Sequence, residues 1–304
     1  PNEELPAARP MKTSPSHDVL ESEGAVFGVT HAMETPQYFV PGGEAFTETP
    51  TLRRPDAARF VAAEVEAVRN AAGVFDSSVY ARYEVSGPGA VAWLDRLVAS
   101  RLPGIGRVRL APMLSHSGRL MGDLTISRLG PDRFWLVGSY YLQDWHMRWF
   151  GGFLPVDGVC VRNISDAWTG FAISGPNARA LMQRLVDQDM SNGNFGFFAA
   201  REMDVAGARA MVARLSLTGE LGYEINLRAA DHRAVYLAMR AAGRDLGLTP
   251  VGNRALDSLR LEKSYGIWSA EFTADYMPDE VGLGRHVDGA KPDFIGRAAV
   301  QAAG

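Results

Sequence analysis

Apolar residues recur at helical spacing in three stretches of the chain. The first predicts a helix from Asp56 to Gly73. Its apolar positions are Phe60, Val61, Val65, Val68 and Ala72. The same pattern predicts helices over residues 231–246 and 253–264, and Gly266 ends the last one.

Shorter apolar or alternating segments predict β-strands. They lie at residues 123–129, 133–139, 158–164, 207–217 and 223–229. In the last segment Tyr223, Ile225 and Leu227 share one face of the strand, because side chains alternate with a period of two. Glu224 is therefore expected on the opposite face, lining a cleft between lobes.

One motif occurs twice. The stretches VSGPGAVAWLDRLV (85–98) and ISGPNARALMQRLV (173–186) each run from an apolar strand end through Ser-Gly-Pro into an amphipathic helix. Such a turn either binds an anion at the helix N-terminus or simply connects strand and helix, and we favour the simple connection. The duplication predicts an α+β protein with two similar lobes, and interfaces between lobes are favoured places for a ligand. A dinucleotide-binding fold is not supported, since no GxGxxG follows a first strand.

The N-terminal residues 1–55 form a proline-rich arm. They contain eight prolines, yet Phe27, Tyr38 and Phe39 make the arm too apolar to remain in solvent, so we expect it to pack on the body. After it, we expect a first α+β lobe over 56–160 and a second over 161–304.

Composition narrows the functional classes. The 304 residues are 46% hydrophobic with a net charge of −4, and the arginines are spread along the sequence, so we expect a folded core and no nucleic-acid partner. Cys160 is the single cysteine and the six histidines lack a metal-binding spacing, so no metal site is predicted. No apolar run is long enough for a membrane span, and we expect a cytoplasmic protein. Because the sequence begins at Pro1, we expect it to be a piece of a longer chain or a processed product.

Three places carry candidate chemistry. Asp123 begins an apolar strand, where desolvation raises the pKa of a carboxyl toward values useful in proton transfer. Trp268 follows the glycine break after a helix and offers a flat stacking surface. In LTGELGYEI (217–225), Glu220 and Glu224 flank a glycine turn, and a carboxylate beside apolar neighbours needs a donor.

Five motifs together resemble the folate-binding aminomethyltransferase family, which includes the glycine-cleavage T-protein. They are FDSSVYARYEVSGPGA, PMLSHSGRLMGDLTISRL, LTGELGYEI, RALDSLRLEKSYGIW and PDEVGLGRHVDGAKPDFIGRAA, in the order and spacing of that family. The segment MKTSPSHDVLESEGAVFGVTHAMETPQYF is closer to the tetrahydrofolate-binding part of dimethylglycine and sarcosine dehydrogenases. The resemblance implies two ferredoxin-like α/β lobes around a central folate funnel. The C-terminal barrel domain that usually follows in the family is expected to be missing or truncated here.

The resemblance also implies site residues. It gives Glu224 the role of pairing with the N–H edge of the pterin, since one carboxylate accepts two parallel hydrogen bonds, and leaves Glu220 as a turn residue. Trp268 is expected beside the folate. Tyr223, Leu217 and Leu110 are the other expected cofactor-binding positions. The catalytic aspartate of the T-protein aligns with Gly122, and in the spacing of the dehydrogenase branch that role falls to Asp123.

The implied function is one-carbon transfer to tetrahydrofolate from an N-methylated amine such as dimethylglycine or sarcosine, giving 5,10-methylenetetrahydrofolate. FAD is expected on a missing domain or on a flavin-dependent dehydrogenase partner. Two alternatives stay open. One is an O- or S-demethylase that transfers methyl to tetrahydrofolate, and the other is a folate-binding module without catalysis, which Gly122, Leu217 and Leu256 would accommodate.

Overall fold

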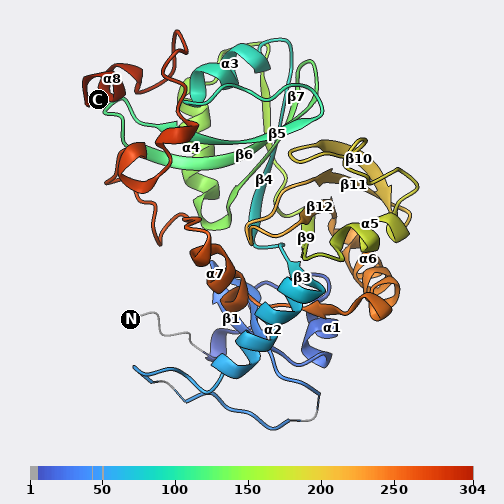
Figure 1. The fold of residues 1–304 in the computed structure, drawn as a ribbon. Coiled ribbons are helices and arrows are strands. Elements are labelled where there is room, and N and C mark those ends of the chain that lie inside the picture. The colour runs from blue at the N-terminus through green and yellow to red at the C-terminus, as the bar shows by residue number, and fades with distance from the viewer. Residues whose placement is uncertain (1–5, 43, 50, 304) are drawn as a thin grey trace. The chain divides into compact units, whose positions relative to one another are not determined.

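The computed structural model describes residues 6–42, 44–49 and 51–303. Residues 1–5, 43 and 50 of the predicted arm lie outside the described residues. The chain forms two compact units whose segments alternate along the sequence (Figure 1). Unit 1 comprises Pro1–Val79, Asp166–Phe197 and Glu202–Tyr265, and unit 2 comprises Tyr80–Ser165, Phe198–Arg201 and Gly266–Gly304.

The larger sheet of unit 1 has six strands in the order β10-β11-β12-β9-β3-β13. These strands are β3 (Ala72–Asp76), β9 (Trp168–Ser174), β10 (Ala200–Val205), β11 (Ala208–Ala213), β12 (Gly222–Arg228) and β13 (Leu248–Pro250). The β13–β3 pair is parallel, whereas β12 runs antiparallel to both β9 and β11. The helices of this unit are α1 (His17–Ser22), α2 (Ala58–Asn70), α5 (Ala178–Leu185), α6 (Ala229–Ala242) and α7 (Asn253–Glu262), with the short turns η1 (Pro6–Ala8) and η3 (Arg244–Leu246).

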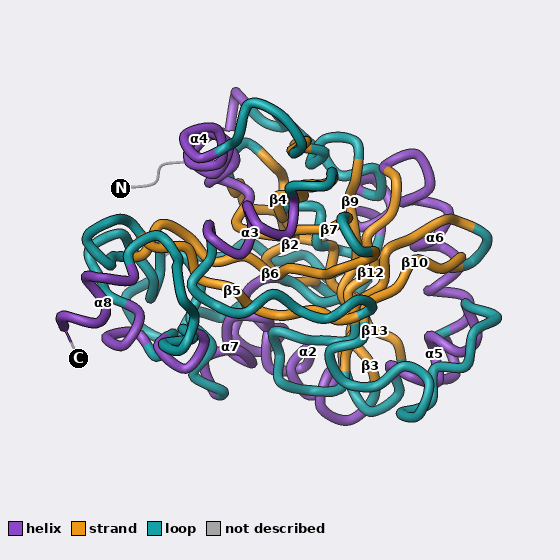
Figure 2. Tube along the Cα trace, turned by 90° about the horizontal axis from the view of Figure 1, so that it is seen from above, coloured by secondary structure: helices purple, strands orange, loops and turns teal. Residues whose placement is uncertain are grey.

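Unit 2 is built on a five-stranded antiparallel sheet of order β5-β6-β7-β4-β8. Its strands are β4 (Tyr80–Ser86), β5 (Arg107–Leu114), β6 (Leu120–Gly130), β7 (Arg133–Ser139) and β8 (Cys160–Asn163). Its helices and turns are α3 (Ala90–Leu97), η2 (Tyr140–Leu142), α4 (Gln143–Phe153), η4 (Pro278–Val281), η5 (Gly284–His286) and α8 (Arg297–Ala303). Figure 2 distinguishes these strands, helices and connecting loops by colour. The α+β class predicted from the sequence is confirmed.

The duplicated motif is present in both units with the same local geometry. In unit 2, β4 runs through Ser86, Gly87 and Pro88 into α3, and in unit 1, β9 runs through the equivalent Ser-Gly-Pro into α5. Gly87 has φ +117° and Gly175 has φ +128°, a region in which a side chain is strained. Backbone oxygens lie 2.4 Å and 2.6 Å from where a Cβ would stand on Gly87 and Gly175, respectively. The two turns are therefore close strand-to-helix connections, as favoured from the sequence.

The predicted division of the chain into contiguous lobes differs from the structure. Residues 56–79 belong to unit 1, because α2 leads into β3 and β3 pairs with β9 of the same sheet. Residues 266–304 belong to unit 2, where Phe272, Leu283 and Phe294 pack in one of its apolar clusters. The expected boundary near residue 160 lies close to the real return at Ser165/Asp166.

The proline-rich arm contains more regular structure than expected. It carries α1 and a hairpin of β1 (Ala25–Thr30) and β2 (Met33–Phe39). The arm packs in unit 1 as predicted, since Tyr38 is 1% exposed and clusters with Phe60. The buried carboxyl of Glu64 accepts hydrogen bonds from the backbone N–H groups of Phe39 (2.6 Å) and Gly252 (2.9 Å). Burial raises the pKa of Glu64 to about 7.

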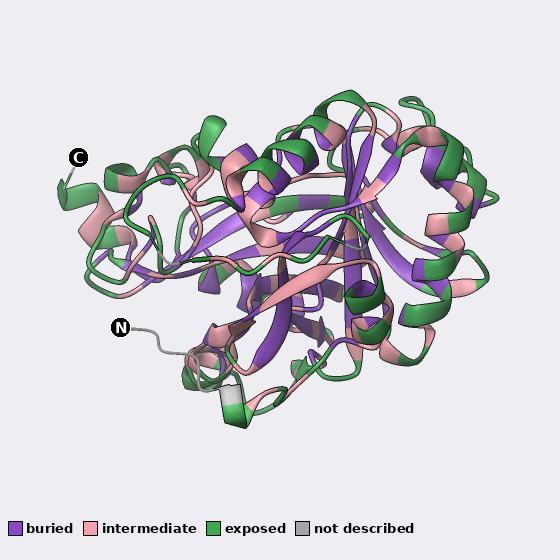
Figure 3. Ribbon diagram, turned by 90° about the horizontal axis from the view of Figure 1, so that it is seen from below, coloured by how far each residue is buried: buried purple, intermediate pink, exposed green. Residues whose placement is uncertain are grey.

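The predicted strand over 133–139 coincides with β7, and the strand over 223–229 is shifted by one residue in β12. The segment 207–217 is shorter than predicted, because only Ala208–Ala213 is β-strand and a loop follows. The helix expected over 231–246 ends at Ala242, followed by η3. Figure 3 shows that the strands of both sheets are mostly buried, whereas the helices carry exposed residues on their outer faces.

Candidate functional site

Asp123 lies on β6, and the register of the sheet places it on a defined face. It stands opposite Pro112 of β5, and directly opposite residues in an antiparallel pair share a face. Pro112 alternates with Leu110 and Leu114, which both pack in the second apolar cluster of unit 2. Asp123 therefore shares the face of that cluster. Its buried members are Ala99, Leu114, Leu120, Leu142, Trp268, Phe272, Leu283 and Phe294.

The neighbouring position, Gly122, faces the other side of the sheet. It stands opposite Met113, which belongs to the first apolar cluster of unit 2, together with Leu124 and Phe150. Gly122 has φ +146°, and a Cβ on it would lie 2.7 Å from Nε2 of the buried His146. Position 122 therefore has no room for a side chain, and the acid of this strand is Asp123.

Asp123 is poised to exchange protons near neutral pH. Its side chain is half-buried, and burial raises its pKa to about 6. No cation contributes to that pKa. A carboxyl with this pKa is the kind of group that general acid–base catalysis uses. The direction of this shift agrees with the desolvation expected from its apolar sequence neighbours.

Tyr141 and Trp268 belong to the surroundings of Asp123. Burial raises the pKa of the Tyr141 phenol, the side chains of Ser269 and Trp268 act to lower it, and the charge of Asp123 acts to raise it. Trp268 is 8% exposed and packs in the same cluster as Leu120. Unit 2 therefore places the predicted acid and the predicted aromatic residue in one neighbourhood.

The loop that carries Trp268 is held by its own backbone hydrogen bonds. Ser269 donates to the carbonyl oxygen of Phe272 at 2.8 Å, and Phe272 donates to that of Ile267 at 3.1 Å. The carboxylate of Glu271 accepts a hydrogen bond from the N–H of Ile267 at 3.0 Å. The indole is thus fixed in the cluster by a short, closed loop.

Leu110 is half-buried and also lines a groove of about 670 Å³ in unit 2. Four arginines line it: Arg101, Arg107 and Arg109 from one stretch of sequence, and Arg285 from a distant one. Asp288 is the one acid among the described lining residues, and it pairs with Arg101. The charges of Arg285 and Arg109, after burial, lower the pKa of His286 in the same groove. This groove suits a carboxylate or another anion.

The predicted residues of unit 1 lie on β12 and the loop before it. Tyr223, Ile225 and Leu227 are fully buried and Glu224 is half-buried, as the alternation predicts, but Asn226 on the face of Glu224 is buried as well, so burial does not alternate along the whole strand. The Tyr223 ring stacks on Phe195, with ring centroids 6.1 Å apart. Tyr223 thus supports β12 from within unit 1, and its role toward a ligand stays a prediction.

The loop before β12 contains Leu217 and Glu220. Leu217 is half-buried. Glu220 lies 3.9 Å from the ammonium of Lys263, and Gly219, with φ +74°, packs closely against the Lys263 side chain. Glu220 is therefore a turn residue with a surface partner, in keeping with the role expected for it. The role of Leu217 toward a cofactor stays a prediction.

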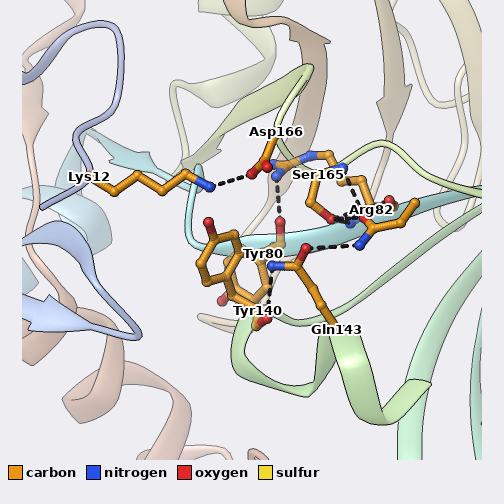
Figure 4. A network of polar contacts seen from close by, with 8 residues as sticks. Lys12, Tyr80, Arg82, Tyr140, Gln143, Ser165 and Asp166 are labelled. Atoms are coloured by element: carbon orange, nitrogen blue, oxygen red, sulfur yellow. Dashed lines mark hydrogen bonds and ion pairs between the residues drawn. The ribbon is translucent and has the colours of Figure 1, made fainter. Parts of the chain in front are cut away.

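Polar contacts at the end of β4 are shown in Figure 4. In unit 2 the guanidinium of the buried Arg82 donates to the carbonyl oxygen of Tyr80 at 2.8 Å, and its backbone N–H donates to Ser165 at 2.9 Å. In unit 1 Lys12 forms an ion pair with Asp166. These contacts fix the ends of the segments where the chain passes from one unit to the other.

Among the residues that the structure describes, no three His, Cys, Asp or Glu side chains are grouped so that they could hold a metal ion. Cys160 is exposed. No helix in the described ranges is long and apolar enough to cross a bilayer.

Comparison with known proteins decides the family. A family model described as the GCVT N-terminal domain matches residues 16–291. The chain belongs to this aminomethyltransferase family. A solved structure of glycine cleavage system aminomethyltransferase T from Bartonella henselae superposes with a TM-score of 0.81 at 25% identity, covering 96% of this chain and 74% of that chain. The aminomethyltransferase fold is thus present, as the sequence resemblance implied.

Several curated relatives are similar to this aminomethyltransferase-type chain over most of its length. Mitochondrial dimethylglycine dehydrogenase of Rattus norvegicus is 32% identical over 309 residues, which cover 99% of this chain and 36% of that protein. Sarcosine oxidase subunit alpha of Rhizobium meliloti (strain 1021) is 33% identical, covering 97% of this chain and 30% of that protein. Aminomethyltransferase of Bacillus subtilis (strain 168) is 35% identical, covering 78% and 66%, respectively. The chain therefore spans about a third of the length of the dehydrogenase and oxidase relatives.

Proposed function

We propose that this chain transfers a one-carbon unit from an N-methylated amine, such as dimethylglycine or sarcosine, to tetrahydrofolate. The product is 5,10-methylenetetrahydrofolate. One observation carries the proposal. In a member of the aminomethyltransferase family, the half-buried acid Asp123, with a pKa of about 6, shares its neighbourhood with Tyr141 and Trp268.

The residues present fit tetrahydrofolate. A flat ring requires an aromatic or apolar wall, which Trp268 and its cluster supply in unit 2. The glutamyl carboxylates of a folate require cations, and the arginine groove beside Leu110 supplies them. Tetrahydrofolate supplies the two amine nitrogens that accept the carbon.

Asp123 has the proton-transfer role in this proposal. Its carboxylate takes a proton from a tetrahydrofolate nitrogen as that nitrogen attacks the carbon. The resulting carboxylic acid then gives a proton to the nitrogen of the donor amine, which leaves as the demethylated amine. A pKa of about 6 keeps both forms accessible near neutral pH. Most of the remaining acceleration comes from holding an amine against a reactive carbon, which the protein achieves by positioning alone.

Glu224 has the binding role. Its half-buried carboxylate, on the face of β12 opposite Tyr223, has two oxygens that accept parallel N–H hydrogen bonds from one edge of a pterin. A charged acceptor of this geometry binds more tightly than a neutral amide. This assignment is independent of the one made for Asp123, so each is tested separately.

The carbon donor requires an oxidation that the described residues do not supply. We assign that step to a flavin-dependent dehydrogenase domain or partner, as the names of the dehydrogenase and oxidase relatives suggest. A flavin there would supply the two-electron oxidation of the N–CH₃ group, with loss of a proton, that converts the amine into an iminium. Asp123 then acts on the nitrogens that capture the carbon.

The experiment uses sarcosine carrying carbon-13 in its methyl group, a flavin-dependent sarcosine-oxidising enzyme, tetrahydrofolate and this protein. We expect labelled 5,10-methylenetetrahydrofolate, by mass spectrometry, faster than in the same mixture without the protein. Labelled 5-methyltetrahydrofolate from an O- or S-methyl donor, with no acceleration from sarcosine, would instead identify a different demethylase. Tetrahydrofolate binding with no acceleration from any donor would identify a binding module and refute the proposal.

A further inference from the structure

The face of the sheet on which the Asp123 side chain lies depends on one extra residue in β6. From Leu114 to Pro112 of β5 the chain advances two positions, whereas the opposite residues on β6, Leu120 and Asp123, are three positions apart. The additional residue is Met121, and the register shift at this point is a β-bulge.

Relative to Leu120, the bulge exchanges the faces of the sheet on which Gly122 and Asp123 lie. In a regular strand, residues 120, 122 and 124 would share a face, and Asp123 would point to the opposite one. With the bulge, Asp123 shares the face of Leu120 and of the cluster that contains Trp268, while Gly122 faces His146. The bulge therefore decides that position 123, and not position 122, presents the acid.

Helix α4 holds the bulge from one side. The indole Nε1 of Trp145 donates a hydrogen bond of 2.8 Å to the carbonyl oxygen of Met121, the extra residue itself. A bulged residue is left outside the regular ladder, so a side-chain donor fixes a carbonyl whose orientation the sheet does not dictate. Trp145 is half-buried and packs against the same cluster as Leu110 and Tyr141.

The next residue of α4 supports Gly122. His146 is fully buried, its Nδ1 lies 3.0 Å from the hydroxyl of Tyr83, and its ring stacks on Phe150. Burial lowers its pKa to about 4, so the imidazole is neutral and adds no charge beside β6. Successive residues of one helix thus fix Met121 and Gly122, the two residues before the acid.

We propose that Trp145 is a positioning residue for Asp123, acting through its hydrogen bond to the Met121 carbonyl. The inference rests on the proposed function for its consequence in turnover, but the positioning itself is a property of the ligand-free protein. It is therefore measured independently of any reaction.

The test compares Trp145→Phe with Trp149→Phe, a matched change on the same helix. Trp149 is also half-buried, and its indole N–H has no hydrogen-bond partner among the described residues. Each variant loses one N–H and keeps an aromatic ring. Carbon-13 NMR of labelled aspartate carboxyls gives the titration of Asp123 in the ligand-free protein, assigned by its absence in Asp123→Asn.

We expect Trp145→Phe to move the Asp123 titration by about one pH unit and Trp149→Phe to leave it in place. Turnover is expected to fall about 10- to 100-fold in Trp145→Phe, with the Kd for tetrahydrofolate within about twofold of the wild type. An unchanged Asp123 titration and unchanged turnover in a folded Trp145→Phe would overturn the proposal. Equal effects of the two substitutions would also overturn it, since they would indicate loss of packing alone.

If Trp145→Phe does not fold, Trp145→benzothienylalanine replaces the N–H by sulfur and keeps the bicyclic shape. The Asp123 titration in that variant then tests the positioning role in the same way. A wild-type protein that shows no turnover would refute the proposed function, but a titration that moves in the Trp145 variant alone would still support the positioning role.

Discussion

Gly122 and His146 occupy adjoining space so closely that a Cβ on Gly122 would stand 2.7 Å from Nε2 of the imidazole. The glycine also adopts φ +146°, which L side chains rarely adopt. Position 122 therefore has no room for the side chain of an acid. The acid is carried by the next residue, which the bulge at Met121 turns to the other face.

The raised pKa of Asp123 predicts a pH-dependent stability. The folded-state pKa, about 6, exceeds the ordinary value of 3.8, so the native state binds the proton more tightly and loses stability as pH rises from about 4 through 6. Asp123→Asn has no carboxyl to ionise and therefore does not lose this stability. We expect it to be more stable than the wild type by about 1–2 kcal/mol at pH 8, allowing for solvent screening of a half-buried group.

Urea denaturation of both proteins at pH 4 and pH 8 measures this difference. The advantage of Asp123→Asn should disappear at pH 4, where both side chains are neutral. A variant that is less stable than the wild type at pH 8 would show that the carboxylate is stabilised in the fold and that its pKa is not raised.

Glu224→Gln tests the binding role of the carboxylate on β12. A hydrogen bond to a charged group is worth about 1.5–3 kcal/mol, so the affinity for tetrahydrofolate should fall about 10- to 150-fold. Isothermal titration calorimetry gives the Kd directly. Glu220→Gln is the control, because the Glu220 carboxylate lies at a turn, 3.9 Å from the ammonium of Lys263. This variant should bind tetrahydrofolate as tightly as the wild type does. Equal losses in both variants would remove the assignment of Glu224.

The arginine groove predicts a salt-dependent contribution to folate affinity. Arg285 lines the groove and lies beside His286, at 3.2 Å, with no carboxylate partner among the described residues. Arg285→Gln should weaken tetrahydrofolate binding by about 1 kcal/mol at low ionic strength, and less at high salt. Arg96→Gln is the control, since Arg96 is exposed and already lies 3.5 Å from Asp293. A salt-independent loss, or an equal loss in both variants, would contradict a role for the groove.

Lys291 should matter for folding and not for chemistry. The side chain is nearly fully buried, and its ammonium donates to the carbonyl oxygens of Val98 (2.7 Å) and Ser100 (3.1 Å), just beyond the end of α3. Lys291→Met leaves these carbonyls without a donor and should destabilise the protein by about 2–4 kcal/mol. Thermal denaturation checks this value. Lys263→Met, at a half-exposed lysine, is the control and should change the free energy of unfolding by less than about 1 kcal/mol. A loss in this control as large as that in Lys291→Met would refute the role of Lys291 at the end of α3.

Local patterns in the sequence predicted local structure well. The segment 133–139 is β7 because its apolar and aromatic residues are bounded by turns, and the duplicated Ser-Gly-Pro stretches gave both strand-to-helix connections. Alternation also placed Glu224 on the face of β12 opposite the fully buried Tyr223, Ile225 and Leu227. Each of these predictions depends on residues that are neighbours in sequence.

Features that depend on distant residues were not predicted. The contiguous lobes were wrong for 56–79 because strand pairing, which joins β3 to β9, is not encoded in the local pattern. Helix α4 was missed because two glycines and several aromatic residues obscure its spacing. The arginine groove was missed because its residues come from separate stretches.

The bulge at Met121 had only a weak signal in the sequence. The predicted strand began only at residue 123, after the bulge, and burial alternates without interruption from Leu120 to Ile126, so neither pattern shows the extra residue. Only the register against β5 shows that one residue is extra. A glycine directly before an acid in a strand is a weak hint, since glycine in a strand often marks a bulge.

The central claim is that Asp123 moves the proton during one-carbon transfer to bound tetrahydrofolate. The most direct test is the single-turnover rate of 5,10-methylenetetrahydrofolate formation by Asp123→Asn and by the wild type, both saturated with tetrahydrofolate. We predict a rate about 100- to 10,000-fold lower in the variant, with an unchanged Kd and without the wild-type inflection near pH 6. A variant that forms the product at the wild-type rate, with the same pH profile, would contradict the account.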